Sequence, residues 1–261
     1  MTQTHSKPPV GRGAGVDAKV SATSTSGDLR AAVLFDIDGT LIVTDGAGAR
    51  SWELAFADLW GVEADITDYS DTGMTDPEVG RRTFEAVMGR SPGAPEFARL
   101  LERRMHYLSQ TVAESSGYRV LPGVEELLPR LVEEGYVLGL VTGNLEAAAH
   151  VKLARGGLNR YFSFGGYGSD SADRVEVTRT AMRRGSVVFG RGVPPAAFLA
   201  VGDTPNDVEA AHAAGIACVA VASHKYGMEQ LEKSGADWVI PSLEHGLPPL
   251  AVQVGQVPKA R

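Results

Sequence analysis

Two pairs of aspartates stand at the ends of apolar runs and are the residues best suited to chemistry. Asp36 and Asp38 follow the run AAVLF, and Asp203 and Asp207 follow AAFLAV and one glycine. A short apolar run without alternation is typical of a strand that is covered on both faces of a parallel sheet. Open α/β sheets bind ligands at the carboxyl ends of such strands. Carboxylates gathered there could share one hard cation, and one of them could attack an electrophile held beside it.

A hydroxyl and a tight turn follow another apolar run. Residues 136–141 predict a second buried strand, residues 145–155 predict a helix, and Thr142-Gly143-Asn144 lies between them. Backbone N–H groups at a helix N-terminus, next to a hydroxyl, can bind an anion such as phosphate. The signal is weak by itself, because Thr and Asn also cap helices.

The order of the remaining patterns predicts an α/β fold, with a Rossmann-like parallel sheet flanked by helices. Further strand patterns and the helical patterns that alternate with them lie at 161–164, 196–201, 216–221 and 238–240, and at 123–134, 175–184, 205–214 and 227–234. Between the first two strands, helical patterns at 49–60, 76–89 and 94–114 run with no strand pattern between 43 and 117. We therefore expect an α-helical domain inserted into the sheet domain.

The expected domain division follows from these patterns. The core domain comprises residues 30–44 and 118–245, and the inserted helical domain comprises 45–117. Residues 1–29 are rich in Ser, Thr, Gly and Pro and predict a disordered tail, and residues 246–261 form a C-terminal tail.

Composition limits the classes of partner. A net charge of −7 without a basic run argues against nucleic acid. A small anionic substrate stays compatible, because local arginines and a metal can reverse the field inside a cleft. No apolar run reaches the roughly 18 residues needed to span a membrane. The single cysteine, Cys218, excludes an internal disulfide, and the N-terminus lacks a signal-peptide apolar core, so we expect a cytoplasmic protein.

In this order, the motifs resemble those of the haloacid dehalogenase superfamily, and the overall layout and the cap position look most like its phosphoglycolate phosphatase group. The family motifs are Asp-x-Asp-x-Thr after the first strand, Thr or Ser after the second, a basic residue, and Gly-Asp-x-x-x-Asp. The resemblance implies that Asp36 is a nucleophile that forms an aspartyl-phosphate, with Asp38 as general acid and base. It further implies Mg²⁺ held by Asp36, by Asp38 through its backbone carbonyl, and by Asp203, with Asp207 as an auxiliary ligand.

The resemblance also assigns residues to the phosphate. They are Gly39, Thr40, Thr142, Gly143, Asn144 and the basic residue of the third motif. That residue is usually Lys in the family, but no Lys occurs between Lys152 and Lys225 here. Arg174 is the candidate and Arg179 the second choice, because an Arg fork can hold both a carboxylate and a phosphate oxygen.

The inserted helical domain matches the position of the family's cap, which implies a lid over the catalytic edge. The turn over 72–76, with Thr75, is the better candidate for substrate selection, ahead of the cap arginines. Asp38 favours a phosphate ester over a halide, because only the ester needs a proton for its leaving oxygen. Residues 43–117 contain no Lys. They therefore lack the cap lysine of the phosphonate-cleaving relatives and the cap His-Lys pair of the mutases.

We therefore expect a Mg²⁺-dependent phosphomonoester hydrolase that acts on a small phosphorylated metabolite. Two alternatives stay open. One is a phosphotransferase or mutase of the same superfamily, and the other is a non-catalytic regulatory protein that binds phosphate groups.

Overall fold

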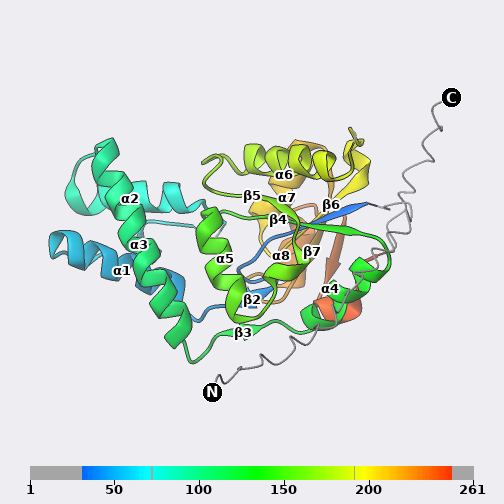
Figure 1. Cartoon of the computed structure of the whole chain (residues 1–261), viewed down its shortest axis with the longest axis horizontal. Helices are drawn as coiled ribbons and strands as arrows, with labels where there is room; N and C mark the ends of the chain where they lie inside the picture. The colour runs from blue at the N-terminus through cyan, green and yellow to red at the C-terminus, as the bar shows by residue number, and fades with distance from the viewer. Residues whose placement is uncertain (1–30, 72, 191, 249–261) are drawn as a thin grey trace, which may run out of the picture.

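A six-stranded parallel sheet is the centre of the protein. The computed structural model describes residues 31–71, 73–190 and 192–248, so the predicted tail 1–29 and most of 246–261 lie outside the described residues. The strands lie in the order β5-β4-β1-β6-β7-β8 (Figure 1). They are β1 (Ala32–Phe35), β4 (Val137–Val141), β5 (Phe164–Gly166), β6 (Phe198–Gly202), β7 (Ala217–Val221) and β8 (Trp238–Ile240). The predicted α/β class is confirmed.

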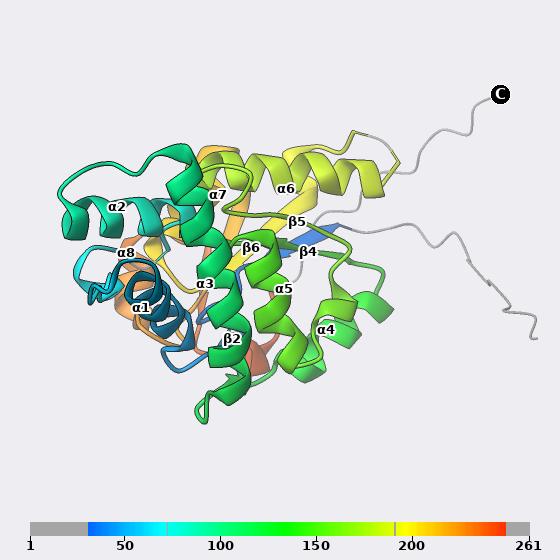
Figure 2. The same cartoon turned by 60° about the vertical axis from the view of Figure 1, so that its left-hand side comes forward.

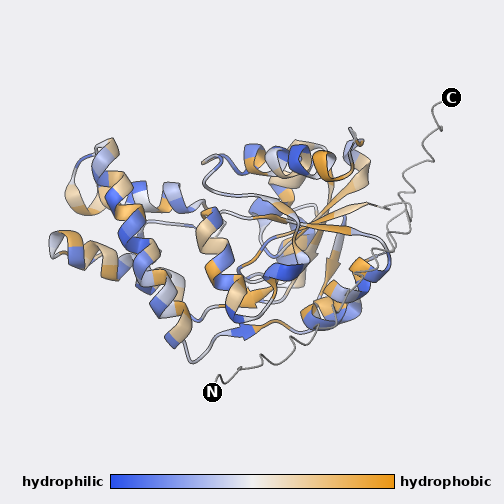
Figure 3. Ribbon diagram, in the orientation of Figure 1, coloured by the Kyte–Doolittle hydropathy of each residue, from blue (hydrophilic) through white to orange (hydrophobic). Residues whose placement is uncertain are grey.

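Helices cover both faces of this sheet, which explains why its strands are apolar without alternation (Figure 3). One face packs against α4 (Val124–Glu133) and α5 (Glu146–Arg155). The other packs against α6 (Arg174–Val188), α7 (Pro205–Ala214) and α8 (Met228–Lys233). All four residues of β1 are buried, with Val33 and Phe35 facing one layer and Ala32 and Leu34 facing the other.

Three helices between β1 and β4 form a second unit with its own apolar core (Figure 2). They are α1 (Ala47–Trp60), α2 (Asp76–Met88) and α3 (Ala94–Glu114). Trp52, Phe56, Phe84 and Leu100 are fully or almost fully buried within it. Gly80 allows α2 to approach α1 closely, because a Cβ there would lie 2.7 Å from the Trp52 ring. We call α1–α3 the helical block.

No helix in the described part of the chain is long and apolar enough to cross a membrane.

Short strands at the base of the helical block were not predicted. β2 (Ile42–Val43) and β3 (Arg119–Val120) pair antiparallel, and they carry the chain into and out of the block. Two residues are too few to show a period of two, so the sequence pattern could not reveal them. Four 3₁₀ turns complete the described chain, at Ile66–Asp68, Asn159–Tyr161, Pro195–Ala197 and Leu243–His245.

The strand expected over 161–164 lies further along the chain, at Phe164–Gly166. Tyr161 instead ends a 3₁₀ turn. The two glycines of β5 hid the strand from a pattern search, but packing requires one of them. A Cβ on Gly166 would stand 2.1 Å from the carbonyl oxygen of Val177 in α6.

Asp76 joins the helical block to the core. Its backbone N–H donates to the carbonyl of Gly143 at 2.7 Å, and its Oδ2 accepts from the backbone N–H of Leu145 at 2.8 Å. Its Oδ1 accepts from Nη2 of Arg104 at 3.0 Å, and the Arg104 side chain is only 1% exposed. No side chain at the N-terminus of α5 caps that helix. Asp76, from the helical block, instead accepts a hydrogen bond from a backbone N–H at this end.

We predict that Asp76→Ala lowers the free energy of unfolding by about 3 kcal/mol, because it leaves the buried Arg104 guanidinium without its carboxylate. Urea denaturation followed by circular dichroism measures the change. Glu78→Ala is the matched control, since it removes the exposed ion pair with Arg82 in the same helix and should change stability by about 0.5 kcal/mol or less. A loss below about 1 kcal/mol for Asp76→Ala would show that the pair does not stabilise this boundary.

Candidate active site

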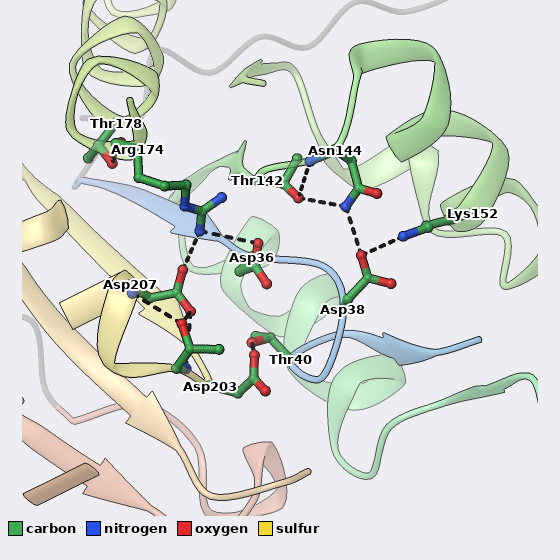
Figure 4. A network of polar contacts seen from close by, with 11 residues as sticks. Asp36, Asp38, Thr40, Thr142, Asn144, Lys152, Arg174, Thr178, Asp203 and Asp207 are labelled. Atoms are coloured by element: carbon green, nitrogen blue, oxygen red, sulfur yellow. Dashed lines mark hydrogen bonds and ion pairs between the residues drawn. The ribbon is translucent and has the colours of Figure 1, made fainter. Parts of the chain in front are cut away.

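The predicted site residues follow three adjacent strands at one edge of the sheet. β1 lies between β4 and β6, and Asp36, Thr142 and Asp203 come directly after these strands (Figure 4). The carboxyl ends of parallel strands meet at one edge, so residues far apart in the sequence become neighbours there.

The turn after β1 packs closely against Asp203. Gly39 has a φ of 85°, and a Cβ there would lie 2.2 Å from Asp203 Oδ2. Thr40 donates its hydroxyl to Asp203 Oδ1 at 3.2 Å. Gly39 and Thr40, both predicted to contact phosphate, therefore shape the loop beside Asp203, and a direct contact with phosphate stays a prediction.

Three carboxylates converge beside this turn. One oxygen each from Asp36, Asp203 and Asp207 lies within 4.8 Å of the others, and all three residues are buried. Burial and then the charges of Asp207 and Asp36 raise the pKa of Asp203 to about 9. Burial and then the charge of Asp207 raise the pKa of Asp36 to about 7, although Arg174 opposes the shift. Without further positive charge, ionising Asp36 and Asp203 together is therefore unfavourable.

A divalent cation fits this cluster. The buried Oδ2 of Asp203 has no hydrogen-bond partner among the described residues, so it is free to act as a ligand. An all-oxygen set of carboxylates matches the preference of hard cations such as Mg²⁺. The structure therefore provides a buried acidic cluster that can hold a metal ion.

Asp207 is bound on both of its oxygens. Its Oδ2 accepts from the backbone N–H of Thr204 at 3.1 Å and from the Thr204 hydroxyl at 2.7 Å, which closes a capping box at the start of α7. Its Oδ1 accepts from Nη2 of Arg174. These contacts leave Asp203 more open to a cation than Asp207, and the auxiliary role of Asp207 stays a prediction.

Arg174 is the basic residue that reaches the cluster. Its Nη2 lies 3.6 Å from Asp36 Oδ1 and also pairs with Asp207, while its Nε and Nη1 are buried without a hydrogen-bond partner in the described part of the chain. Arg179, the second choice, is exposed and pairs with Glu176 at 2.6 Å. Arg174 therefore has two donor nitrogens available for a phosphoryl group beside Asp36, and Arg179 has no such position.

Asp38 points away from the acidic cluster. Its Oδ2 accepts from Lys152 Nζ at 2.6 Å and from Asn144 Nδ2 at 2.7 Å, and Asn144 Nδ2 also donates to the Thr142 hydroxyl at 2.8 Å. Burial acts to raise the pKa of Asp38, but the charge of Lys152 and the hydrogen bonds from Asn144 and Lys152 hold it below its usual value. The predicted contact of Asp38 with the metal, through its backbone carbonyl, stays a prediction.

Lys152 is a site residue that the sequence analysis missed. It lies in α5, 114 residues from Asp38 in the sequence, and its side chain is 6% exposed. A signal was present, because Lys152 shares the buried face of α5 with Ala148, Ala149 and Leu153. A lysine on the apolar stripe of a helix needs a buried partner, and this could have marked it.

The predicted turn from the helical block reaches the same edge. Thr75 is fully buried, and its hydroxyl donates to the carbonyl of Ala172 at 3.4 Å. A Cβ on Gly143 would lie 2.4 Å from the carbonyl oxygen of Met74, so only glycine permits this approach. The turn thus contacts the loops after β4 and β5, and contact of Thr75 with a substrate stays a prediction.

Comparison with known proteins establishes the family. The model of the haloacid dehalogenase-like hydrolase family matches residues 31–215. The chain belongs to this family of hydrolases.

Named relatives and a solved structure show which group within the family this chain is similar to. Phosphoglycolate phosphatase from Yersinia pestis is 30% identical over 227 residues, covering 84% of this chain and 93% of its own. The enzyme of the same name from Synechococcus elongatus is 29% identical over 214 residues, covering 80% and 92%. The crystal structure of CbbY from Rhodobacter sphaeroides in complex with phosphate has a TM-score of 0.66 at 23% identity, covering 82% of this chain and 95% of its own. The chain is a phosphatase of the phosphoglycolate phosphatase-like group.

We predict that Mg²⁺ raises the melting temperature more at higher pH. The pKa of Asp203 lies at about 9 in the metal-free fold and at 3.8 in its ordinary state, so the associated stability is present below 3.8 and is lost as the pH rises through about 9. A divalent cation bound at the cluster would replace the protons and remove this loss. Calorimetry should show a rise of about 5 °C or more near pH 8 and a smaller one near pH 6.

Asp203→Asn is the control, because it keeps the shape of the side chain and removes the charge. The rise at high pH should disappear in this variant. An equal rise at both pH values, or a full rise in Asp203→Asn, would contradict a cation site at this cluster.

Proposed function

We propose that the chain is a Mg²⁺-dependent phosphomonoesterase that acts on a small phosphorylated metabolite through an aspartyl-phosphate on Asp36. The arrangement around Asp36 carries this proposal. Arg174 lies on one side of it, with two donor nitrogens that have no hydrogen-bond partner among the described residues. Asp203, with one oxygen that likewise has no partner in that part of the chain, belongs to the same cluster. Asp38 stands two residues further along, on the side of Thr142 and Asn144 (Figure 4).

In the first step, the carboxylate of Asp36 attacks phosphorus and the bond between phosphorus and the ester oxygen breaks. The carboxyl proton of Asp38 goes to the leaving oxygen. Because burial raises the pKa of Asp36, positive charge is needed to keep it ionised, and Arg174 provides part of that charge. A divalent cation held by Asp36 and Asp203, with Asp207 nearby, would supply further positive charge to the nucleophile and the phosphoryl oxygens.

In the second step, water attacks the phosphorus of the aspartyl-phosphate. The Asp38 carboxylate accepts the proton of this water, the bond between Asp36 and phosphorus breaks, and inorganic phosphate leaves. We assign the phosphoryl oxygens to Arg174, to the Thr142 hydroxyl and to the backbone of Gly143. The side-chain amide of Asn144 joins Thr142 to Asp38, and contact of Asn144 with phosphate stays a prediction.

The first substrate to consider is 2-phosphoglycolate, because the relatives at about 30% identity are named for it. Hydrolysis is favoured over transfer to a second hydroxyl, since residues 43–117 contain no Lys to hold an acceptor as in the mutases. A purely regulatory protein would not need Asp38, Arg174 and the acidic cluster in one place. A location in the cytoplasm also belongs to this proposal, and it rests on the sequence alone.

We predict that phosphate release is fastest from 2-phosphoglycolate in a panel that includes sugar phosphates and nucleotides. Its kcat/KM should exceed about 10⁴ M⁻¹s⁻¹ and should depend on added Mg²⁺. Asp36→Asn serves as the blank and should reduce kcat at least about 10³-fold with an unchanged circular dichroism spectrum. Activity of this variant within about tenfold of wild type would exclude Asp36 as the nucleophile. No Mg²⁺-dependent release from any compound would favour the regulatory alternative.

A further inference from the structure

We propose that Lys152 is a positioning residue for Asp38, which fixes the orientation of the Asp38 carboxyl group. The inference rests on the proposed function, in which Asp38 exchanges a proton with the leaving oxygen and with water. It concerns a lysine outside the family motifs that the sequence resembles.

The hydrogen bonds of the Asp38 side chain define its orientation. Both go to Oδ2, from Lys152 Nζ at 2.6 Å and from Asn144 Nδ2 at 2.7 Å, and Figure 4 shows the two contacts ending on the same oxygen. The side chain of Asp38 is 42% exposed, whereas that of Lys152 is 6% exposed. An oxygen that already accepts from an ammonium group and an amide is a poor place for a proton. The exchangeable proton of Asp38 therefore belongs on Oδ1.

The burial of Lys152 is difficult to explain by stability alone. Its side chain is 6% exposed, and Asp38 is the carboxylate with which it forms an ion pair within the described residues. Removing an ammonium group from water costs several kcal/mol, and an apolar side chain of similar volume at such a place is often as stable or more stable. The Lys152 charge therefore has a use other than holding α5 in place.

The surroundings of Lys152 fix its ammonium group relative to the site. Tyr118 donates its hydroxyl to the backbone carbonyl of Lys152 at 2.9 Å, which ties that turn of α5 to the chain leaving the helical block. On the other side, Asn144 connects Asp38 to the Thr142 hydroxyl. Because the terminal torsion of an aspartate is broad, two donors on one oxygen are an effective way to hold it.

Replacing Lys152 should therefore lower the rate of phosphoenzyme formation most for esters whose leaving oxygen must be protonated. An alkoxide leaves poorly unless it is protonated, whereas p-nitrophenolate leaves readily without help. A positioned general acid contributes about 10² to 10⁴ in rate. Because kcat/KM covers only the steps up to formation of the phosphoenzyme, it isolates the step in which Asp38 acts as an acid.

The test compares kcat/KM of wild type and Lys152→Met on three esters: 2-phosphoglycolate, glycerol 3-phosphate and p-nitrophenyl phosphate. We expect a loss of about 10²-fold on both alkyl esters and of less than about fivefold on the aryl ester. Lys152→Arg, which keeps a cationic donor, should restore the alkyl esters to within about tenfold of wild type. Lys233→Met is the matched control, because Lys233 is an exposed lysine paired with Glu229, and it should change none of the three values.

Circular dichroism and the melting temperature show whether each variant is folded, and Lys152→Gln replaces Lys152→Met if the latter is not. Equal losses on all three esters would overturn the inference and indicate a structural role. A loss confined to 2-phosphoglycolate would also overturn it, since Lys152 would then bind the carboxylate of the substrate. Wild-type protein that hydrolyses none of the esters would overturn the proposed function itself, an outcome distinct from the other two.

Discussion

Asp36, Asp203 and Asp207 meet at one edge of a buried parallel sheet, where burial and the neighbouring carboxylates raise the pKa of Asp36 and of Asp203. The topology enforces this meeting, because β1 and β6 are neighbours and each is followed directly by an aspartate. Repulsion of this kind is relieved by protons, by Arg174 or by a cation. In the proposed reaction, the ionised form of Asp36 is the reactive one, so the local charge balance controls the nucleophile.

The site divides into two halves on either side of Asp36. The half next to β6 and α7 is acidic and suits a cation and the phosphoryl group. In this half, Arg174 pairs with both Asp36 and Asp207. The half next to β4 and α5 contains Asp38 under the control of Asn144 and Lys152. Nucleophilic attack and proton transfer need opposite surroundings, one that gathers anions and one that isolates a single carboxyl group. The sheet provides both because β4 and β6 lie on opposite sides of β1.

The sequence predicted the parallel sheet and the residues that follow its strands, because apolar strands and their terminal aspartates are local patterns. It could not decide between Arg174 and Arg179, since both lie on the same helix and only packing places Arg174 beside Asp36. It also missed the pairing of Lys152 with Asp38, which depends on how α5 packs against the loop after β1. The sequence analysis also missed the pairing of β2 with β3, because a strand of two residues is too short to show an alternating pattern.

A crystal soaked in Mn²⁺ would test the central claim most directly, because Mn²⁺ takes the same oxygen ligands as Mg²⁺ and gives an anomalous signal. The account predicts one strong anomalous peak in contact with the carboxylates of Asp36 and Asp203 and close to Asp207. The same soak of Asp203→Asn should weaken or abolish that peak. Absence of a peak at the cluster in the wild-type crystal, with binding elsewhere on the molecule, would contradict the claim that these carboxylates hold a divalent cation.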